Sequence, residues 1–198
     1  MSPRADGPFQ RWREAFLQQV QDPALAAPLK EAALAGRLAD WTASLTLAVV
    51  RSCETLVWRA AGKGHALSLL PQVGQEYLGI DVMAFVGAAS THWPLPVAAF
   101  ELENHARDDR VAYSLWKVLC LRVGLRVVFA YRPDWERGAQ LVSTLTNEVL
   151  AGLRPEQRTA IEGQTVLVVG NRGEGQTFPW GYFKFWMLDA NLGRFEKI

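Results

Sequence analysis

The chain has 198 residues, of which 49% are hydrophobic and 21% are charged, and its formal net charge is +1. This size and composition suit one compact domain with a sizeable core, and they exclude a disordered or fibrous protein. The near-zero net charge does not indicate a general polyanion binder, so any nucleic-acid site must be a local basic patch.

The sequence favours a cytoplasmic protein. No apolar run reaches the roughly 18 residues needed to span a bilayer, so no membrane association is expected. The first seven residues lack the apolar core of a signal peptide. Cys53 and Cys120 both fall in apolar, helical patterns, where a reduced and buried thiol is expected.

The N-terminal part is predicted to be helical. Apolar residues recur at helical spacing over 9–20, and Asp22-Pro23 ends that helix. The following stretch, 25–61, is rich in Ala and Leu, with a break expected near Gly36 or Asp40. Its later part is apolar nearly all round, which predicts a core helix over 45–61 that Gly62-Lys63-Gly64 caps.

Strands and helices alternate in the rest of the chain. The expected elements are strands over 77–85 and 97–103, a helix over 108–122, a strand over 126–131, a helix over 135–153, and strands over 165–170 and 178–188. This order predicts an α/β fold with a mixed central sheet flanked by helices. We expect the first three of these strands to share one sheet, with the helix 45–61 packed on it.

Acidic residues interrupt two of these apolar strands. Asp81 lies in the first, and Glu101 and Glu103 lie in the second, two residues apart. Strand side chains alternate, so both glutamates face one side while Phe100 and Leu102 enter the opposite layer. A half-exposed strand edge has the same alternation. Central strands would bury these carboxylates, however, and a divalent cation such as Mg²⁺ would then hold them together.

An acid on one strand, an acidic-x-(acidic or Lys) triplet on the next, a helix and an apolar strand resemble the PD-(D/E)XK nuclease superfamily. The resemblance covers about residues 45–132 and implies a restriction-endonuclease-like fold. It implies that Asp81 and Glu101 are the two motif acids, and that Glu103 stands where the lysine usually stands. Glu54 occupies a place where many members carry a further acid.

The missing motif lysine has two replacements among the members that this chain resembles. Some restriction endonucleases carry Glu at that position, and other members take a lysine from the following helix. Lys117 is the candidate for the second arrangement, on the predicted helix 108–122. The alternative is that Lys117 extends from an amphipathic helix into water.

The resemblance implies a Mg²⁺- or Mn²⁺-dependent nuclease acting on DNA. Asp81, Glu101 and Glu103 would be metal ligands, Glu103 could instead act as a general base, and Lys117 would complete the catalytic residues. The alternative function is a catalytically inactive member of the same fold that binds a protein or a nucleic acid. The chain is expected to form a single domain over 1–198, with helices over 9–61 before the core 45–132 and a C-terminal part over 135–198.

Two further patterns leave alternatives open. His105 could join Glu101 and Glu103 in a transition-metal site if the strand extended that far, or it could lie in a solvated loop. The aromatic residues of 180–186 could offer stacking surfaces for unpaired bases, or they could form core and a homodimer contact.

Overall fold

The computed structural model of this chain describes residues 7–86 and 93–198. The helices are α1 (Pro8–Gln21), α2 (Pro23–Ala35), α3 (Leu38–Thr55), α4 (Asp108–Leu119), α5 (Trp135–Leu145) and α6 (Pro155–Thr159). The strands are β1 (Trp58–Gly62), β2 (Val82–Val86), β3 (Ala98–Leu102), β4 (Leu125–Arg132), β5 (Gln164–Asn171), β6 (Phe183–Asp189) and β7 (Arg194–Lys197). Three short helical segments complete the chain, namely η1 (Tyr77–Gly79), η2 (Thr146–Leu150) and η3 (Arg172–Thr177).

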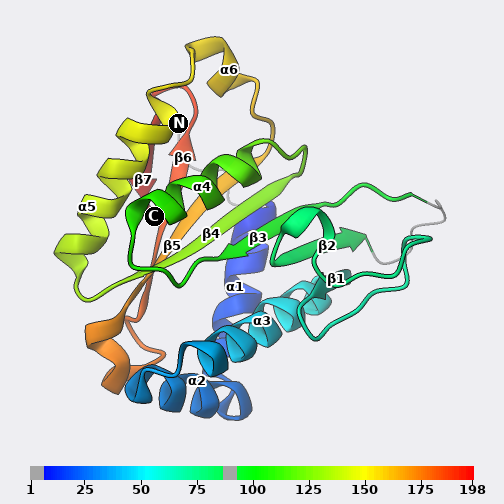
Figure 1. The fold of residues 1–198 in the computed structure, drawn as a ribbon, viewed down its shortest axis with the longest axis vertical. Coiled ribbons are helices and arrows are strands. Elements are labelled where there is room, and N and C mark those ends of the chain that lie inside the picture. Colours follow the sequence, from blue (N-terminus) through cyan, green and yellow to red (C-terminus); the bar gives the residue numbers. More distant parts are fainter. Residues whose placement is uncertain (1–6, 87–92) are drawn as a thin grey trace.

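The protein has an α/β fold with one seven-stranded mixed sheet, as the sequence predicts. The strands lie side by side in chain order, from β1 at one edge to β7 at the other (Figure 1). The pairs β3–β4 and β4–β5 are parallel, and the other neighbouring pairs are antiparallel. The segments 77–85, 97–103 and 126–131 therefore share one sheet, although 77–79 form the turn η1 and the strand β2 begins at Val82.

Helices cover both faces of the sheet. On one face α1, α2 and α3 enclose a core that includes Phe100, Val127 and Val168 from the central strands. On the other face α4 and α5 enclose a second core, with Ala99, Val128 and Leu167 from the same strands. Figure 1 shows α4 crossing one face of the sheet and α1 lying behind it. Neighbouring positions on each strand thus enter opposite layers, as side-chain alternation requires.

The first helix is amphipathic, as predicted, and its apolar side forms the centre of one core. Trp12 and Phe16 are fully buried, and their rings stack with centroids 5.1 Å apart. Trp12 also lies against Phe100 and Phe129, with ring centroids 5.2 and 6.1 Å away. Aromatic rings at this spacing add attraction beyond the area they bury, so α1 is firmly attached to β3 and β4.

The predicted core helix 45–61 is wrong at its C-terminal end. The helix α3 ends at Thr55, and Val57 adopts a left-handed backbone with φ of 60°. Residues 58–62 then form the edge strand β1, which pairs with β2. The short apolar run that contains Ala60 and Ala61 suits a buried helix and a buried strand equally, so the pattern could not distinguish them.

Several smaller expectations also need correction. The predicted helix 135–153 consists of α5 followed by the π-helical turn η2, and the predicted strand 178–188 begins only at Phe183. Neither α6 nor β7 was expected. Cys53 is buried, but Cys120 is exposed because it follows the last turn of α4.

The aromatic residues of 180–186 form core in this structure rather than a free stacking surface. Tyr182, Phe183, Phe185 and Trp186 are buried, whereas Trp180 is 66% exposed. Among the residues that the structure describes, no helix is long and apolar enough to cross a membrane.

Candidate functional site

The pairing of β2 with β3 brings Asp81 and Glu101 together. Val82 pairs with Phe100 and Met83 with Ala99, so the same antiparallel register places Asp81 directly opposite Glu101. Side chains directly opposite one another in such a pair have Cβ atoms about 5 Å apart. Asp81 and Glu101 therefore share one face of the sheet, the face that α4 covers.

Glu101 is a buried carboxylate. Its residue is only 4% exposed, and burial is the largest of the effects that raise the pKa of its carboxyl to about 7. Repulsion from Asp81 raises the pKa further, whereas Lys117 and the buried hydroxyl of Ser114 lower it. Desolvation is therefore a larger cause of the raised pKa than like-charge repulsion.

Lys117 reaches this carboxylate from α4. Its ammonium Nζ lies 2.9 Å from Glu101 Oε1 and donates a hydrogen bond of 2.7 Å to the carbonyl oxygen of Gly79. The side chain is 24% exposed, so it does not extend freely into water. The predicted placement of Lys117 beside Glu101 is confirmed, and the alternative of a solvent-facing lysine is wrong.

The two oxygens of Asp81 have different surroundings. Oδ2 accepts a hydrogen bond of 2.7 Å from the backbone N–H of Leu102. This side-chain hydrogen bond joins the two strands just beyond the last backbone pair of β2 and β3. Burial raises the pKa of the Asp81 carboxyl, while this hydrogen bond and the charge of Lys117 lower it. Oδ1 accepts no hydrogen bond from any residue that the structure describes.

Glu103 stands beside the pair rather than within it. It lies on the same strand face as Glu101, and its charge raises the pKa of Asp81. Its Oε1, however, accepts a hydrogen bond of 2.7 Å from the backbone N–H of His105. Within residues 7–86 and 93–198, no group of three or more His, Cys, Asp or Glu side chains is arranged to hold a metal ion. The expected three-carboxylate group is therefore not assembled.

The other expected acid and histidine lie apart from the site. Glu54 is exposed on α3, which covers the opposite face of the sheet from α4. His105 is exposed after the end of β3, and its Nδ1 accepts a hydrogen bond of 3.1 Å from the backbone N–H of Arg107. This placement agrees with the loop alternative for His105 and removes it from a transition-metal site with Glu101.

The oxygen donors present fit a hard divalent cation. The buried Glu101 Oε1 is paired with the Lys117 ammonium at 2.9 Å, so the second Glu101 oxygen is the one that would bind a cation. Asp81 Oδ1 has no hydrogen-bond donor among the described residues. Mg²⁺ is often bound by one or two carboxylates together with water and substrate phosphate oxygens, so this pair supplies enough protein ligands.

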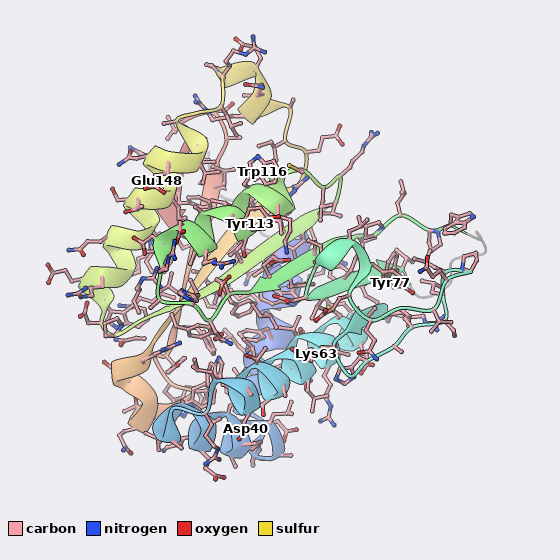
Figure 2. The ribbon with its side chains drawn as sticks, in the orientation of Figure 1. Asp40, Lys63, Tyr77, Tyr113, Trp116 and Glu148 are labelled. Carbon is pink, nitrogen blue, oxygen red and sulfur yellow. The ribbon has the colours of Figure 1, made fainter. Side chains whose placement is uncertain are left out.

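Further groups around the pair could not be assigned from the sequence. The β1–β2 register extended by one residue places Lys63 opposite Asp81, and its charge lowers the pKa of that carboxyl. Tyr113 and Trp116 are more than half exposed on α4, and their stacked ring centroids are 5.9 Å apart. Figure 2 shows Lys63 beside α3 and the two aromatic side chains on α4. Lys63 lies near Asp81 only because of the register of β1 against β2, which cannot be read from the sequence.

Comparison with known proteins gives no identification. No protein-family model, no curated protein and no solved structure matches this chain.

Proposed function

We propose that this protein is a Mg²⁺- or Mn²⁺-dependent phosphodiesterase that acts on DNA. The proposal depends chiefly on one observation, the contact of Lys117 Nζ with the buried Glu101 carboxylate at 2.9 Å. A lysine from the following helix is one of the two replacements that the resemblance to the PD-(D/E)XK superfamily implies when the motif lysine is absent. The succession of β2, β3, α4 and the buried β4 also agrees with that resemblance.

Asp81 and Glu101 would hold the metal through the carboxylate oxygens that neither the Leu102 N–H nor Lys117 contacts. When bound there, the ion would lower the pKa of a coordinated water and neutralise charge on the scissile phosphate. The two carboxylates repel one another in a partly buried site and Lys117 offsets only part of this effect, so a divalent cation would favour ionisation of both. Their cross-strand placement fixes their separation through the backbone of β2 and β3.

Lys117 would orient and stabilise charge without serving as a ligand. Its hydrogen bond to Gly79 O holds the ammonium at the edge of the carboxylate pair, where a phosphate oxygen would lie. An ammonium in a partly dry site stabilises a developing negative charge more strongly than it would in water. Glu103, two residues beyond Glu101 on the same face, is the carboxylate that we assign to accept the proton of the attacking water.

A cleavage assay tests the proposal. We expect the wild-type protein to cleave single- or double-stranded DNA with Mg²⁺ or Mn²⁺ and to be inactive with EDTA. Glu101→Gln should abolish both cleavage and metal binding. Lys117→Ala should lower kcat by at least about 100-fold, the lower end of the effect of a positioned charged group, while Mn²⁺ binding measured by calorimetry persists.

The control for this assay is Lys197→Ala, which removes an exposed lysine on β7, far along the sheet from β3. It should leave cleavage unchanged. If Lys117→Ala matched this control in the presence of an active wild-type enzyme, Lys117 would have no part in the chemistry.

A non-catalytic binding module is the second candidate function. The observation that favours it is the lack of a third ligand in the described residues, since an Asp81–Glu101–Lys117 cluster can also be a structural ion pair. In that case DNA binding would be independent of Mg²⁺, no cleavage would occur, and Lys117→Ala would mainly destabilise the fold by leaving Glu101 unpaired.

A further inference from the structure

A basic cavity opens at the carboxyl ends of the parallel strands. Its volume is about 360 Å³, and it lies between the first turns of α4 and α5. Arg132 ends β4, Arg172 follows β5, and Arg137 belongs to the first turn of α5. Asp108, the first residue of α4, is the fourth charged group in its lining. Ligands of open α/β sheets are usually bound at this end of the strands.

The charges in this arginine cavity (Arg132, Arg137 and Arg172 with Asp108) do not balance. Asp108 forms an ion pair with Arg132, which is only 6% exposed, and Arg132 also donates a hydrogen bond of 2.6 Å to the carbonyl oxygen of Tyr131. Among the described residues, neither Arg137 nor Arg172 forms an ion pair. Three guanidinium groups against one carboxylate leave two positive charges for a ligand.

Arg172 is held in position at this cavity. Its guanidinium lies 5.6 Å from the centroid of the Tyr131 ring, and its Nη2 donates a hydrogen bond of 3.1 Å to the carbonyl oxygen of Asn104. A guanidinium presents five N–H donors, so these contacts leave others for an anion. A positioned arginine loses less conformational entropy on binding than a free one, which favours a specific site over a diffuse patch.

The same contact relates the cavity to the carboxylates. Asn104 follows Glu101 by three residues, which corresponds to roughly 10 Å along an extended chain. A nucleic-acid strand of a few nucleotides could therefore span the distance from Glu101 and Asp81 to Arg172. Arg172 contacts Asn104, the residue that follows Glu103. A nucleic-acid strand held at Glu101 would bring another phosphate near this cavity.

We propose that the arginine cavity binds a phosphate group of the same nucleic-acid strand that is cleaved at Asp81 and Glu101. This inference rests on the proposed function. The planar forks of Arg137 and Arg172 match pairs of phosphate oxygens, and the side-chain amide of Gln140 lies in the same lining. The cavity volume is in the range of pockets that hold small ligands, so a phosphate with its sugar would fit. The phosphate is either internal or at the end of the strand.

Equilibrium binding tests this proposal without catalysis. The probes are fluorescein-labelled single-stranded and double-stranded DNA oligonucleotides, each with a 5′-phosphate or a 5′-hydroxyl, measured by anisotropy in EDTA. The variants are Arg137→Gln and Arg172→Gln, singly and together. The matched control is Arg11→Gln, which removes an exposed arginine from α1 on the other face of the sheet. We expect the double variant to lose at least about tenfold in affinity and the control to lose none.

The end group of the oligonucleotide distinguishes the two sources of the phosphate. If the wild-type protein prefers the 5′-phosphate and the double variant loses that preference, the cavity binds a strand terminus. If the loss is equal for both oligonucleotides, the cavity binds an internal phosphate. In the cleavage assay Arg137→Gln should raise KM and leave kcat nearly unchanged, because a distant phosphate contact binds substrate and transition state alike.

The proposal is overturned if the wild-type protein binds none of these oligonucleotides, or if the double variant binds them as tightly as Arg11→Gln does. These outcomes are separate from failure of the proposed function. If the protein binds DNA through Arg137 and Arg172 but cleaves none with Mg²⁺ or Mn²⁺, phosphate binding in the arginine cavity is supported and the nuclease function is contradicted. If the protein cleaves DNA and neither arginine affects binding, the nuclease function is supported and phosphate binding in the cavity is contradicted.

Discussion

Glu101 is an acidic residue buried in an otherwise apolar strand, and this burial determines the pKa of its carboxyl. Burial favours the neutral form of a carboxyl, and Lys117 at 2.9 Å only partly offsets this effect, so the pKa remains raised to about 7. A core that needed only packing would place an apolar residue here, as it does at Ala99 on the same face. A buried group with a strongly raised pKa beside a second acid is typical of functional sites.

This raised pKa predicts how metal-free stability depends on pH. The folded protein holds its Glu101 proton up to about pH 7, whereas the unfolded chain releases it near pH 4.5. The folded state binds more protons between these values, so the Glu101 contribution to stability falls as pH rises from 4.5 to 7 and is fully lost above 7. In EDTA, Glu101→Gln should therefore gain stability relative to wild type at pH 8, by on the order of 3 kcal/mol at most.

Chemical denaturation of both proteins at pH 4.5 and pH 8 measures this difference. Added Mg²⁺ should stabilise the wild-type protein and not Glu101→Gln, because binding to the folded state alone raises stability. If wild type and Glu101→Gln have parallel stability curves between pH 4.5 and 8, the carboxyl titrates normally and is not desolvated.

At the scale of elements, α4 is attached to the sheet by buried polar contacts as well as apolar ones. Arg126, the first residue of the predicted apolar strand 126–131, is only 2% exposed. Its guanidinium donates hydrogen bonds to the carbonyl oxygens of Val118 and Leu121 at the end of α4, and to that of Glu162 before β5. Arg126 thus satisfies carbonyl groups that a helix end leaves without partners.

We expect Arg126→Leu to destabilise the protein by about 2–4 kcal/mol, because it leaves several buried carbonyl groups without donors. Urea denaturation at neutral pH measures the change in the free energy of unfolding. The control is Arg11→Leu, an exposed site on α1 where the change should stay within about 0.5 kcal/mol. A loss at Arg126 no larger than that at Arg11 would mean that water replaces the guanidinium at the end of α4.

The sequence predicts those parts of the site that local periodicity determines. Alternation along β3 placed Glu101 opposite in direction to Phe100. Helical spacing put Lys117 on a different face of its helix from the apolar residues, and only the family resemblance indicated that it would reach Glu101. The position of Asp81 across from Glu101 depends instead on how β2 pairs with β3. That register is set by the whole hairpin and by packing on both faces, so no local pattern contains it.

The arginine cavity likewise depends on tertiary structure and not on a local sequence pattern. Arg132, Arg137 and Arg172 lie on three elements that come together only where β4 and β5 end. Each of them alone resembles an ordinary surface or strand-end arginine in the sequence. The prediction of the boundary between α3 and β1 was wrong for another reason. A short run of Ala and Gly after an apolar helix carries too little periodicity to show where the strand begins.

For the molecule as a whole, a net charge of +1 limits how nucleic acid can bind. Long-range attraction is weak, so affinity must come from a few local cations. Those near the two candidate sites are Lys63, Lys117, Arg137 and Arg172. Each phosphate neutralised contributes about −0.9 for duplex DNA, or about −0.7 for a single strand, to the slope of log K against log salt concentration.

We therefore expect a slope no steeper than about −4 for the wild-type protein, the value for four duplex phosphate contacts. Lys117 is already paired with Glu101, so it contributes fully only when a bound metal neutralises that carboxylate. The combined Arg137→Gln and Arg172→Gln variant loses two phosphate contacts, so the magnitude of its slope should fall by about 1.4 for a single strand or about 1.8 for duplex DNA. The Arg11→Gln variant should have the wild-type slope. Anisotropy titrations from low to moderate salt measure all three slopes. A wild-type slope near twice that limit would require a basic surface far larger than these four residues provide, and would place the main nucleic-acid contact elsewhere on the protein.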